Sequence, residues 1–202
     1  MLRIALCCVL MLSGAAWADT PVKQVFDQEQ RALKALSSQK KAALFQRPET
    51  DVKYTRDWLA KNAVAKGGEQ WRCLAEALYF EARGESVKGQ FAVAEVILNR
   101  VDSPNYPGSV CAVIHQGTGR KFQCQFTYTC DGNKEVIAEP KAFKQVGRVA
   151  HVMVNGGDRS LTKGATHYHT RQVRPKWART YPRTASIGFH HFYRQSYRVS
   201  QN

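Results

Sequence analysis

Two apolar patterns that follow each other directly constrain the fold of this chain more than any other feature. The first spans Trp71 to Ala82, and its apolar residues recur at the 3.6-residue period that places them on one face of a helix. The second spans Val87 to Val101 and leaves so little polar face that it is typical of a largely buried helix. Arg83-Gly84 lies between them and is a typical helix end. The sequence therefore predicts two consecutive helices, the second buried more deeply than the first.

Weaker patterns on both sides complete the predicted order of elements. Before the pair, an amphipathic helix is expected over Phe26–Phe45 and a short one over Tyr54–Val64, followed by a break at Lys66-Gly67-Gly68. After the pair, a turn cluster precedes further predicted elements: a short helix at Val110–His115, a strand or extended loop at Gln123–Tyr128, a helix at Ala138–Val154 starting near Pro140, and strands at Thr166–Thr170 and Ile187–Tyr193. Helices first and a small sheet late indicate an α+β fold.

The first residues have the features of a secretory signal. Arg3 precedes an apolar stretch, Ile4–Leu12, and Ala16-Trp17-Ala18 matches a signal-peptidase site. The stretch is too short to span a membrane, and no run of about 18 apolar residues occurs elsewhere. We therefore expect residues 1–18 to be removed and no transmembrane segment to remain.

Removal of that segment leaves an even number of cysteines. The chain has six, of which Cys73, Cys111, Cys124 and Cys130 would remain. After a secretory signal this pattern predicts disulfides in an oxidising compartment. Of the three pairings, Cys124–Cys130 with Cys73–Cys111 is favoured, because the first pair closes a short loop. A zinc site is the alternative, although the spacings contain no C-x-x-C.

The charge of the chain indicates an anionic partner. Lys and Arg number 30 against 16 Asp and Glu, a net charge of +14 spread along the whole sequence. Nucleic acid is one such partner, and the carboxylate-rich polymer of a bacterial cell wall is another. A merely soluble basic surface is the third interpretation.

Carboxylates of the first strong helix are the first candidates for chemistry. Glu76 points away from its apolar face, whereas Glu81 lies at the edge of that face. A half-dry carboxyl has a raised pKa, and a carboxyl that stays protonated near neutral pH can donate its proton to a glycosidic oxygen. The alternative is a Glu81 that simply pairs with Arg83, Arg100 or a helix end.

Histidines and aromatic residues gather late in the chain. His167 and His169 share one face of a predicted strand with Tyr168 on the other, and His190-His191 could add a third zinc ligand. Hydrogen bonds around a polar cleft are the competing interpretation. The aromatic residues could belong to the core or could form a stacking platform for sugars or bases: Phe126, Tyr128, Tyr168, Trp177, Phe189, Phe192 and Tyr193.

These motifs together resemble a known family. Cys73-Leu-Ala-Glu-Ala-Leu-Tyr-Phe-Glu-Ala-Arg-Gly-Glu85, followed by Gly89-Gln-Phe-Ala-Val-Ala-Glu-Val-Ile-Leu-Asn-Arg-Val101, is similar to the catalytic domain of spore-cortex-lytic enzymes, the cell wall hydrolases of the SleB/CwlJ type. Gly164-Ala-Thr-His-Tyr-His169 and Ile187-Gly-Phe-His-His-Phe-Tyr-Arg194 resemble the family's last strands. Cys124 to Gly132 resembles its Gram-negative branch, which usually has Ser where Thr127 stands.

The resemblance implies a lysozyme-like α+β domain that acts on peptidoglycan glycan strands. It further implies a lytic transglycosylase that cleaves between N-acetylmuramic acid and N-acetylglucosamine with a single catalytic glutamate, Glu81, and without a metal or other cofactor. Glu85 is the fallback, and the expected substrate-binding residues are Glu85, Phe126, Tyr128, His167 and Tyr168. An N-acetylmuramoyl-L-alanine amidase, with or without zinc, and a non-catalytic wall-binding protein are the alternatives.

The resemblance also sets the expected domain boundaries. Residues 69–196 would form the catalytic domain, between a helical extension at 19–68 and a tail at 197–202. The extension is a candidate site for a protein partner, and no nucleic acid is expected to bind. The secretory signal, the cysteines and the short spacer place the protein in a Gram-negative periplasm.

Overall fold

The computed structural model describes residues 21–38, 52–119 and 123–195. The predicted signal peptide and tail lie outside these residues. The chain divides into two compact units, residues 1–49 and 50–202. Within the described residues, no helix combines the length and the apolar character that crossing a bilayer requires.

The described part of the first unit consists mainly of one helix, α1 (Pro21–Ala35). This helix begins earlier than the predicted Phe26–Phe45 and ends before Leu36, whose N–H donates to the Leu33 carbonyl in a tighter turn. The predicted residues beyond 38 are outside the described part of the chain. Phe26 is 55% exposed and Leu33 is 40% exposed, so the thin apolar face of α1 stays accessible.

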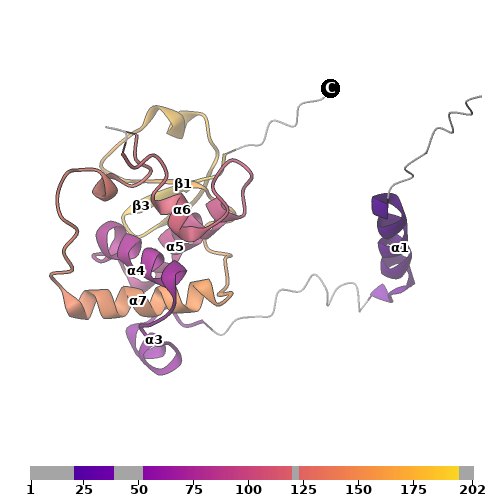
Figure 1. Ribbon diagram of the computed structural model, residues 1–202, viewed down its shortest axis with the longest axis horizontal. Helices are drawn as coiled ribbons and strands as arrows, with labels where there is room; N and C mark the ends of the chain where they lie inside the picture. The colour runs from indigo at the N-terminus through magenta and orange to yellow at the C-terminus, as the bar shows by residue number, and fades with distance from the viewer. Residues whose placement is uncertain (1–20, 39–51, 120–122, 196–202) are drawn as a thin grey trace, which may run out of the picture. The chain divides into compact units, whose positions relative to one another are not determined.

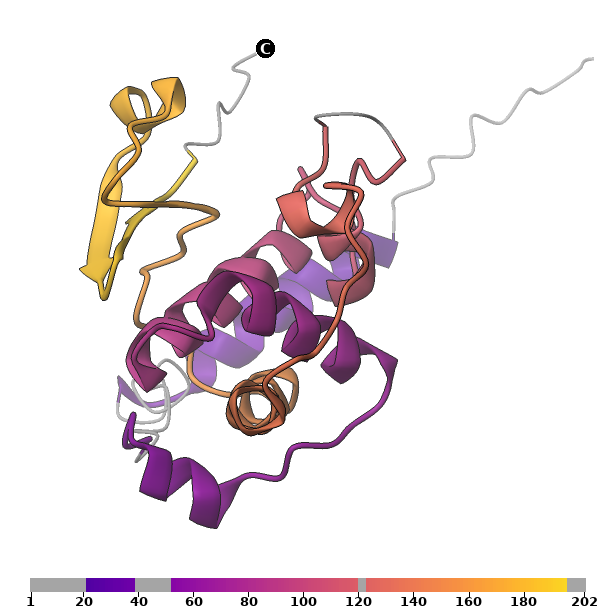
Figure 2. The same cartoon turned by 90° about the vertical axis from the view of Figure 1, so that its left-hand side faces the viewer.

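Helices form most of the second unit. They are α3 (Arg56–Asn62), α4 (Glu69–Ala82), α5 (Val87–Val101), α6 (Val110–Ile114) and α7 (Pro140–Val154). The most extensive packing joins α4 to α7, and α5 contacts α4, α6 and α7 (Figure 1). Figure 2 views α7 end-on beneath the neighbouring helices, with the strands gathered at one side of the helical layer. Helical packing therefore builds the core of this unit.

Local sequence signals explain where these helices start. Ser86 and Ser109 cap α5 and α6, because their hydroxyls accept hydrogen bonds from the N–H groups of Gly89 and Ala112. Pro140 occupies the first turn of α7, where a missing N–H costs nothing. The bounds predicted for α5 are confirmed, and α4 starts only two residues earlier than predicted. α5 is indeed buried on almost every side.

Three short strands follow the helices. β1 (His167–Thr170), β3 (His190–Tyr193) and β2 (Arg183–Ile187) form an antiparallel sheet in the order β1-β3-β2. In the register, Tyr168 pairs with Phe192 on the face that packs toward the helices, and His169 pairs with His191 on the other. The sheet thereby separates two sets of side chains that alternate along the same strands.

The structure corrects one prediction for this part of the chain and decides between the two forms predicted for another. The expected strand at Ile187–Tyr193 is a tight hairpin, because Gly188 adopts a φ of +57° and ends β2 at Ile187. No strand forms in the described part of Gln123–Tyr128, which is a loop running into a single 3-10 turn at Thr127–Thr129. The Cys124–Cys130 bridge and the hydrogen bond from Gln125 N to Gln116 O hold this loop instead of a strand partner.

The second compact unit extends further toward the N-terminus than the predicted domain boundary at residue 69. The compact unit begins at Thr50, and α3 contacts α7. Leu59 is fully buried, and the Tyr54 ring meets the Phe91 ring edge to face at 5.1 Å. The sequence of α3 is too short and too polar to reveal this packing by itself. The predicted extension therefore includes residues that pack in the core of the second unit.

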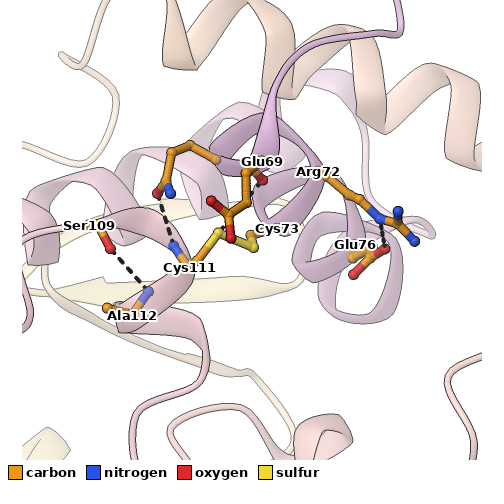
Figure 3. The surroundings of a disulfide bond; sticks show 8 residues. Glu69, Arg72, Cys73, Glu76, Ser109, Cys111 and Ala112 are labelled. Carbon is orange, nitrogen blue, oxygen red and sulfur yellow. Dashed lines mark hydrogen bonds and ion pairs between the residues drawn. A yellow bond between two sulfur atoms is a disulfide. The ribbon is translucent and has the colours of Figure 1, made fainter.

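Both favoured disulfides are present. Cys73 of α4 is bonded to Cys111 of α6, with their Cα atoms 5.3 Å apart (Figure 3). Cys124 is bonded to Cys130, with their Cα atoms 6.3 Å apart. The first bridge joins two helices, and the second closes the loop that precedes α7.

Candidate active site

Glu81 lies in the last turn of α4, where the helix meets the sheet. Its carboxylate Oε2 accepts a hydrogen bond of 3.0 Å from the Tyr168 hydroxyl of β1. Leu78 and Ala82, on the neighbouring positions of the helix, are buried and fix the orientation of this turn. The edge position predicted from the helical pattern therefore places the carboxyl between a dry interior and an accessible surface.

The surroundings of Glu81 favour its protonated form. Burial is the main influence and raises the pKa of the Glu81 carboxyl above its ordinary value. The Tyr168 hydrogen bond and the charge of Arg100 act in the opposite direction and are weaker. The Arg100 side chain is buried and its Nε donates to the Thr166 carbonyl at 2.7 Å, so this charge is held at a fixed place.

Two cavities meet at Glu81. One has a volume of about 230 Å³ and is lined by Arg100 of α5, by the 125–127 loop, by Trp177, and by His167 and Tyr168 of β1. The other has a volume of about 380 Å³ and is lined by the 81–85 segment, by residues 170–172, and by Phe189 and His190. Glu81 is therefore the residue that the two cavities share.

The structure brings most of the predicted substrate-binding residues to this place. Tyr168 touches Glu81 directly, and His167 lines the smaller cavity. Burial, followed by the charge of Arg100, lowers the pKa of His167 to about 4, so this imidazole is neutral at physiological pH. Tyr128 stacks on Phe80 with the ring centroids 4.5 Å apart, and burial, followed by the charge of Glu81, raises the pKa of its phenol.

Phe126 has a more internal position than a sugar-stacking role suggests. Its side chain is only 2% exposed, and the Arg100 guanidinium lies 5.5 Å from its ring centroid. Phe126 lines the smaller cavity together with Arg100 and presents little open surface. Its clearest effect is to hold the cation near Glu81.

Glu85 is engaged by the β2–β3 hairpin. Its Oε1 accepts a hydrogen bond of 3.0 Å from Phe189 N and lies 2.8 Å from His190 Nδ1. A Cβ atom on Gly188 would lie 2.0 Å from Oε2, and one on Gly89 would lie 2.7 Å from it. The carboxylate, 5% exposed, thus fills a space that two glycines leave open. This arrangement makes Glu85 a positioning residue for the hairpin beside the site.

Phe189, Arg100 and Trp177 were not assigned to the site from the sequence. Phe189 is 67% exposed at the hairpin turn and lines the larger cavity. The sequence prediction of one continuous strand over residues 187–193 contained no turn, so it gave no reason to single out Phe189. The Gly188-Phe189 pair near the start of that segment was the one sequence signal for a turn.

The histidines considered as zinc ligands have other partners. His169 Nε2 lies 3.0 Å from the Tyr193 hydroxyl, His190 faces Glu85, and His191 Nδ1 lies 2.8 Å from Ser186 Oγ. In residues 21–38, 52–119 and 123–195, no group of three or more His, Cys, Asp or Glu side chains could hold a metal ion. The hydrogen-bonding interpretation therefore describes these residues better than the metal interpretation.

Comparison with known proteins agrees with this geometry. The cell wall hydrolase family matches residues 84–193. The spore cortex-lytic enzyme of Bacillus subtilis is 35% identical over 122 residues, which cover 60% of this chain and 36% of that enzyme. The enzyme of the same name from Halalkalibacterium halodurans is 37% identical over 120 residues, 59% of this chain and 33% of that enzyme. The chain thus spans about a third of the length of these curated relatives.

A solved structure supports the fold. The catalytic domain of the germination-specific lytic transglycosylase SleB from Bacillus anthracis superposes with a TM-score of 0.51 at 33% identity, covering 64% of this chain and 97% of that domain. The predicted α+β, lysozyme-like architecture is confirmed by this similarity. The family match begins at Gly84, three residues after Glu81, so the assignment of Glu81 rests on the geometry described above.

Proposed function

Because the chain belongs to the cell wall hydrolase family, we propose that it cleaves the glycosidic bond between N-acetylmuramic acid and N-acetylglucosamine in peptidoglycan, as a lytic transglycosylase. The observation that carries this proposal is the position of Glu81. Its carboxyl has a raised pKa and lies where two cavities meet. A carboxyl in that environment can act as an acid and then as a base near neutral pH.

In the first step, protonated Glu81 donates its proton to the oxygen that links the two sugars. The bond between that oxygen and C1 of the muramoyl residue breaks, and positive charge develops at C1. The leaving sugar keeps the oxygen and the transferred proton as a hydroxyl. The Tyr168 hydroxyl, 3.0 Å from Glu81 Oε2, stabilises the carboxylate that remains.

In the second step, the muramoyl C6 hydroxyl attacks C1. Its proton passes to the Glu81 carboxylate, which restores the starting acid, and a 1,6-anhydro ring forms. Water is not consumed, so one carboxyl serves both steps in turn. Simple hydrolysis normally uses a second carboxylate, and Glu85 is poorly suited to that role because the hairpin holds its Oε1 and its side chain is only 5% exposed.

Substitution of Glu81 tests the proposal. We expect Glu81→Gln to abolish the release of 1,6-anhydro muropeptides from purified sacculi, because an amide is far too weak an acid to protonate the leaving oxygen. Mass spectrometry of the soluble products measures the outcome. The matched control is Glu76→Gln, on the same helix, whose carboxylate forms an exposed pair with Arg72 at 2.9 Å (Figure 3). Unchanged activity of Glu81→Gln would contradict the assignment.

The products also separate the alternatives. Reducing ends in place of anhydro ends indicate a muramidase. Free stem peptides indicate an amidase, and inactivation by a chelator would then indicate zinc. Binding to sacculi without any product indicates a wall-binding protein.

The proposed location is the periplasm of a Gram-negative cell. Residues 1–18 have the pattern of a cleaved signal, and two disulfides suit an oxidising compartment. The apolar residues of α1 that remain exposed are consistent with a protein partner for the N-terminal segment. Fractionation of cells that produce the full chain, followed by sequencing of its N-terminus, tests the location and the cleavage after Ala18.

A further inference from the structure

We propose that a cavity on the face of the sheet turned away from the helices binds carboxylate groups of the peptidoglycan stem peptide. This arginine cavity, as we call it, has a volume of about 450 Å³. It is lined by four arginines and by His169, His191 and Tyr193. The arginines are Arg171, Arg174, Arg179 and Arg183. The inference rests on the proposed function, because it identifies a second part of the same polymer as a ligand.

The fold brings these arginines together from separate elements. Arg171 follows β1, Arg174 lies in the next loop, Arg179 ends the 3-10 turn at Lys176–Arg179, and Arg183 begins β2. The alternation of side chains along β1 and β3 explains which strand residues line this cavity. His169, His191 and Tyr193 lie on one face, while Tyr168 and Phe192 occupy the face toward Glu81 and the core. Arg171 is the one lining residue that this cavity shares with the two cavities at Glu81.

The charge of the arginine cavity points to an anionic ligand. None of its lining residues is acidic, and none of the four arginines forms an ion pair with a carboxylate of the described residues. All four arginines are exposed, and like charges gathered around one cavity attract an anion that reduces their mutual repulsion. Burial, followed by the charges of Arg183 and Arg171, lowers the pKa of His191 beside them.

Arginine side chains suit carboxylates in particular. A guanidinium can donate two parallel hydrogen bonds to one carboxylate, and several of them can hold a ligand with more than one carboxylate. A cavity of about 450 Å³ is in the size range that binds a small molecule or a short peptide. In intact peptidoglycan the lactyl carboxyl of each substituted muramoyl residue is neutralised by its amide bond to the stem peptide, whereas the stem peptide carries free carboxylates, so the peptide is the part of the polymer that this cavity suits.

Arg171 connects the arginine cavity to the active site. This residue lines both the arginine cavity and the larger cavity beside Glu81. Its backbone N–H donates to the Phe189 carbonyl at 2.9 Å, which ties it to the hairpin of the active site. A stem peptide attached to a muramoyl residue near Glu81 could thus follow the edge of the sheet past Arg171. Binding there would select glycan strands that carry peptides.

The test compares substrates with and without stem peptides. Arg174→Ala/Arg179→Ala removes two arginines that do not line the cavities at Glu81. We expect kcat/KM on intact sacculi to fall at least about tenfold, because each lost charge-assisted contact weakens binding to this degree. On glycan strands stripped of peptides, the variant should equal the wild type. Lys134→Ala/Lys141→Ala, which removes the same charge from exposed positions elsewhere, should equal the wild type on both substrates.

A binding measurement keeps this inference separate from the proposed function. Calorimetry with the free tripeptide L-Ala-D-Glu-diaminopimelate should show binding to Glu81→Gln protein and loss of at least about tenfold in affinity when the two arginines are also replaced. Equal losses on both polymer substrates, no loss on sacculi, or binding of inorganic phosphate as tight as that of the peptide would overturn the inference. If neither polymer is cleaved by the wild type, the proposed function fails while this binding result still decides the inference.

Discussion

At the scale of single residues, the proposed chemistry depends on the balance of influences on one carboxyl. Burial raises the pKa of Glu81, and the Tyr168 hydroxyl and the Arg100 guanidinium partly offset that rise. The first influence supplies a proton for the leaving oxygen, and the other two stabilise the carboxylate that receives a proton in the second step. A site with burial alone would hold its proton too strongly to work in both directions.

This balance predicts the pH dependence of the activity. The first step needs protonated Glu81, so kcat/KM falls as the pH rises through the raised pKa of this group. Tyr168→Phe removes a hydrogen bond that lowers this pKa, so we expect the alkaline limb of the profile to move to higher pH. Turnover of sacculi between pH 4 and 9 measures the shift.

The control for this prediction is Tyr181→Phe. Tyr181 contacts His167 and Trp177 by its ring and has no hydrogen bond to Glu81. Its substitution should leave the position of the limb unchanged. A limb that moves to lower pH in Tyr168→Phe would contradict the influence assigned to the phenol.

At the scale of elements, one buried carboxylate holds the β2–β3 hairpin against the start of α5. Glu85 bonds to Phe189 N and contacts His190, and it occupies the space beside Gly89 and Gly188. This contact places the exposed Phe189 ring in the wall of the larger cavity. The hairpin is therefore positioned by its turn as well as by its pairing with β1.

Substitution of Gly188 tests this arrangement. Gly188→Ala places a Cβ 2.0 Å from Glu85 Oε2 at a residue with φ of +57°, so the carboxylate must move and lose its contacts with the hairpin. We expect the free energy of unfolding to fall by at least about 2 kcal/mol. Gly132→Ala, where φ is +83° but no atom lies within 4 Å of the added Cβ, should cost only about 1 kcal/mol. Urea denaturation measures both, and equal losses would show that the carboxylate is not confined by Gly188.

At the scale of the whole second unit, the two disulfides stabilise different parts of the fold. Cys73–Cys111 joins α4 to α6 across a sequence separation of 38, whereas Cys124–Cys130 closes a separation of 6 (Figure 3 shows the first bridge). A crosslink that closes a longer loop restricts the unfolded chain more strongly. The first bridge should therefore contribute more to the stability of the unit.

Paired serine variants measure the two contributions. Loop-closure entropy predicts a loss of about 4 kcal/mol for Cys73→Ser/Cys111→Ser and about 2 kcal/mol for Cys124→Ser/Cys130→Ser. Thermal denaturation of both variants beside the wild type under non-reducing conditions gives the comparison. A larger loss for the shorter loop would mean that native contacts, rather than chain entropy, dominate.

The sequence predicted the elements whose signals are local. The 3.6-residue period identified α4 and α5, Pro140 marked the start of α7, and the short Cys124–Cys130 loop indicated the pairing of the cysteines. The helical pattern also placed Glu81 at the partly buried edge of the apolar face of its helix. Short segments were predicted less well, because α3 and the hairpin are stabilised by contacts with distant residues rather than by their own periodicity.

By itself, the sequence determined the helical order, the cysteine bridges and which carboxyl lies at the border of an apolar face, because these depend on residues a few positions apart. The tertiary structure alone decided that Tyr168 reaches Glu81 across 87 residues, that Glu85 serves the hairpin, and that four arginines share one cavity. Such relations arise when a sheet packs on helices and sorts alternate side chains to opposite faces. No local sequence pattern shows which distant residue will lie opposite a given side chain in the folded protein.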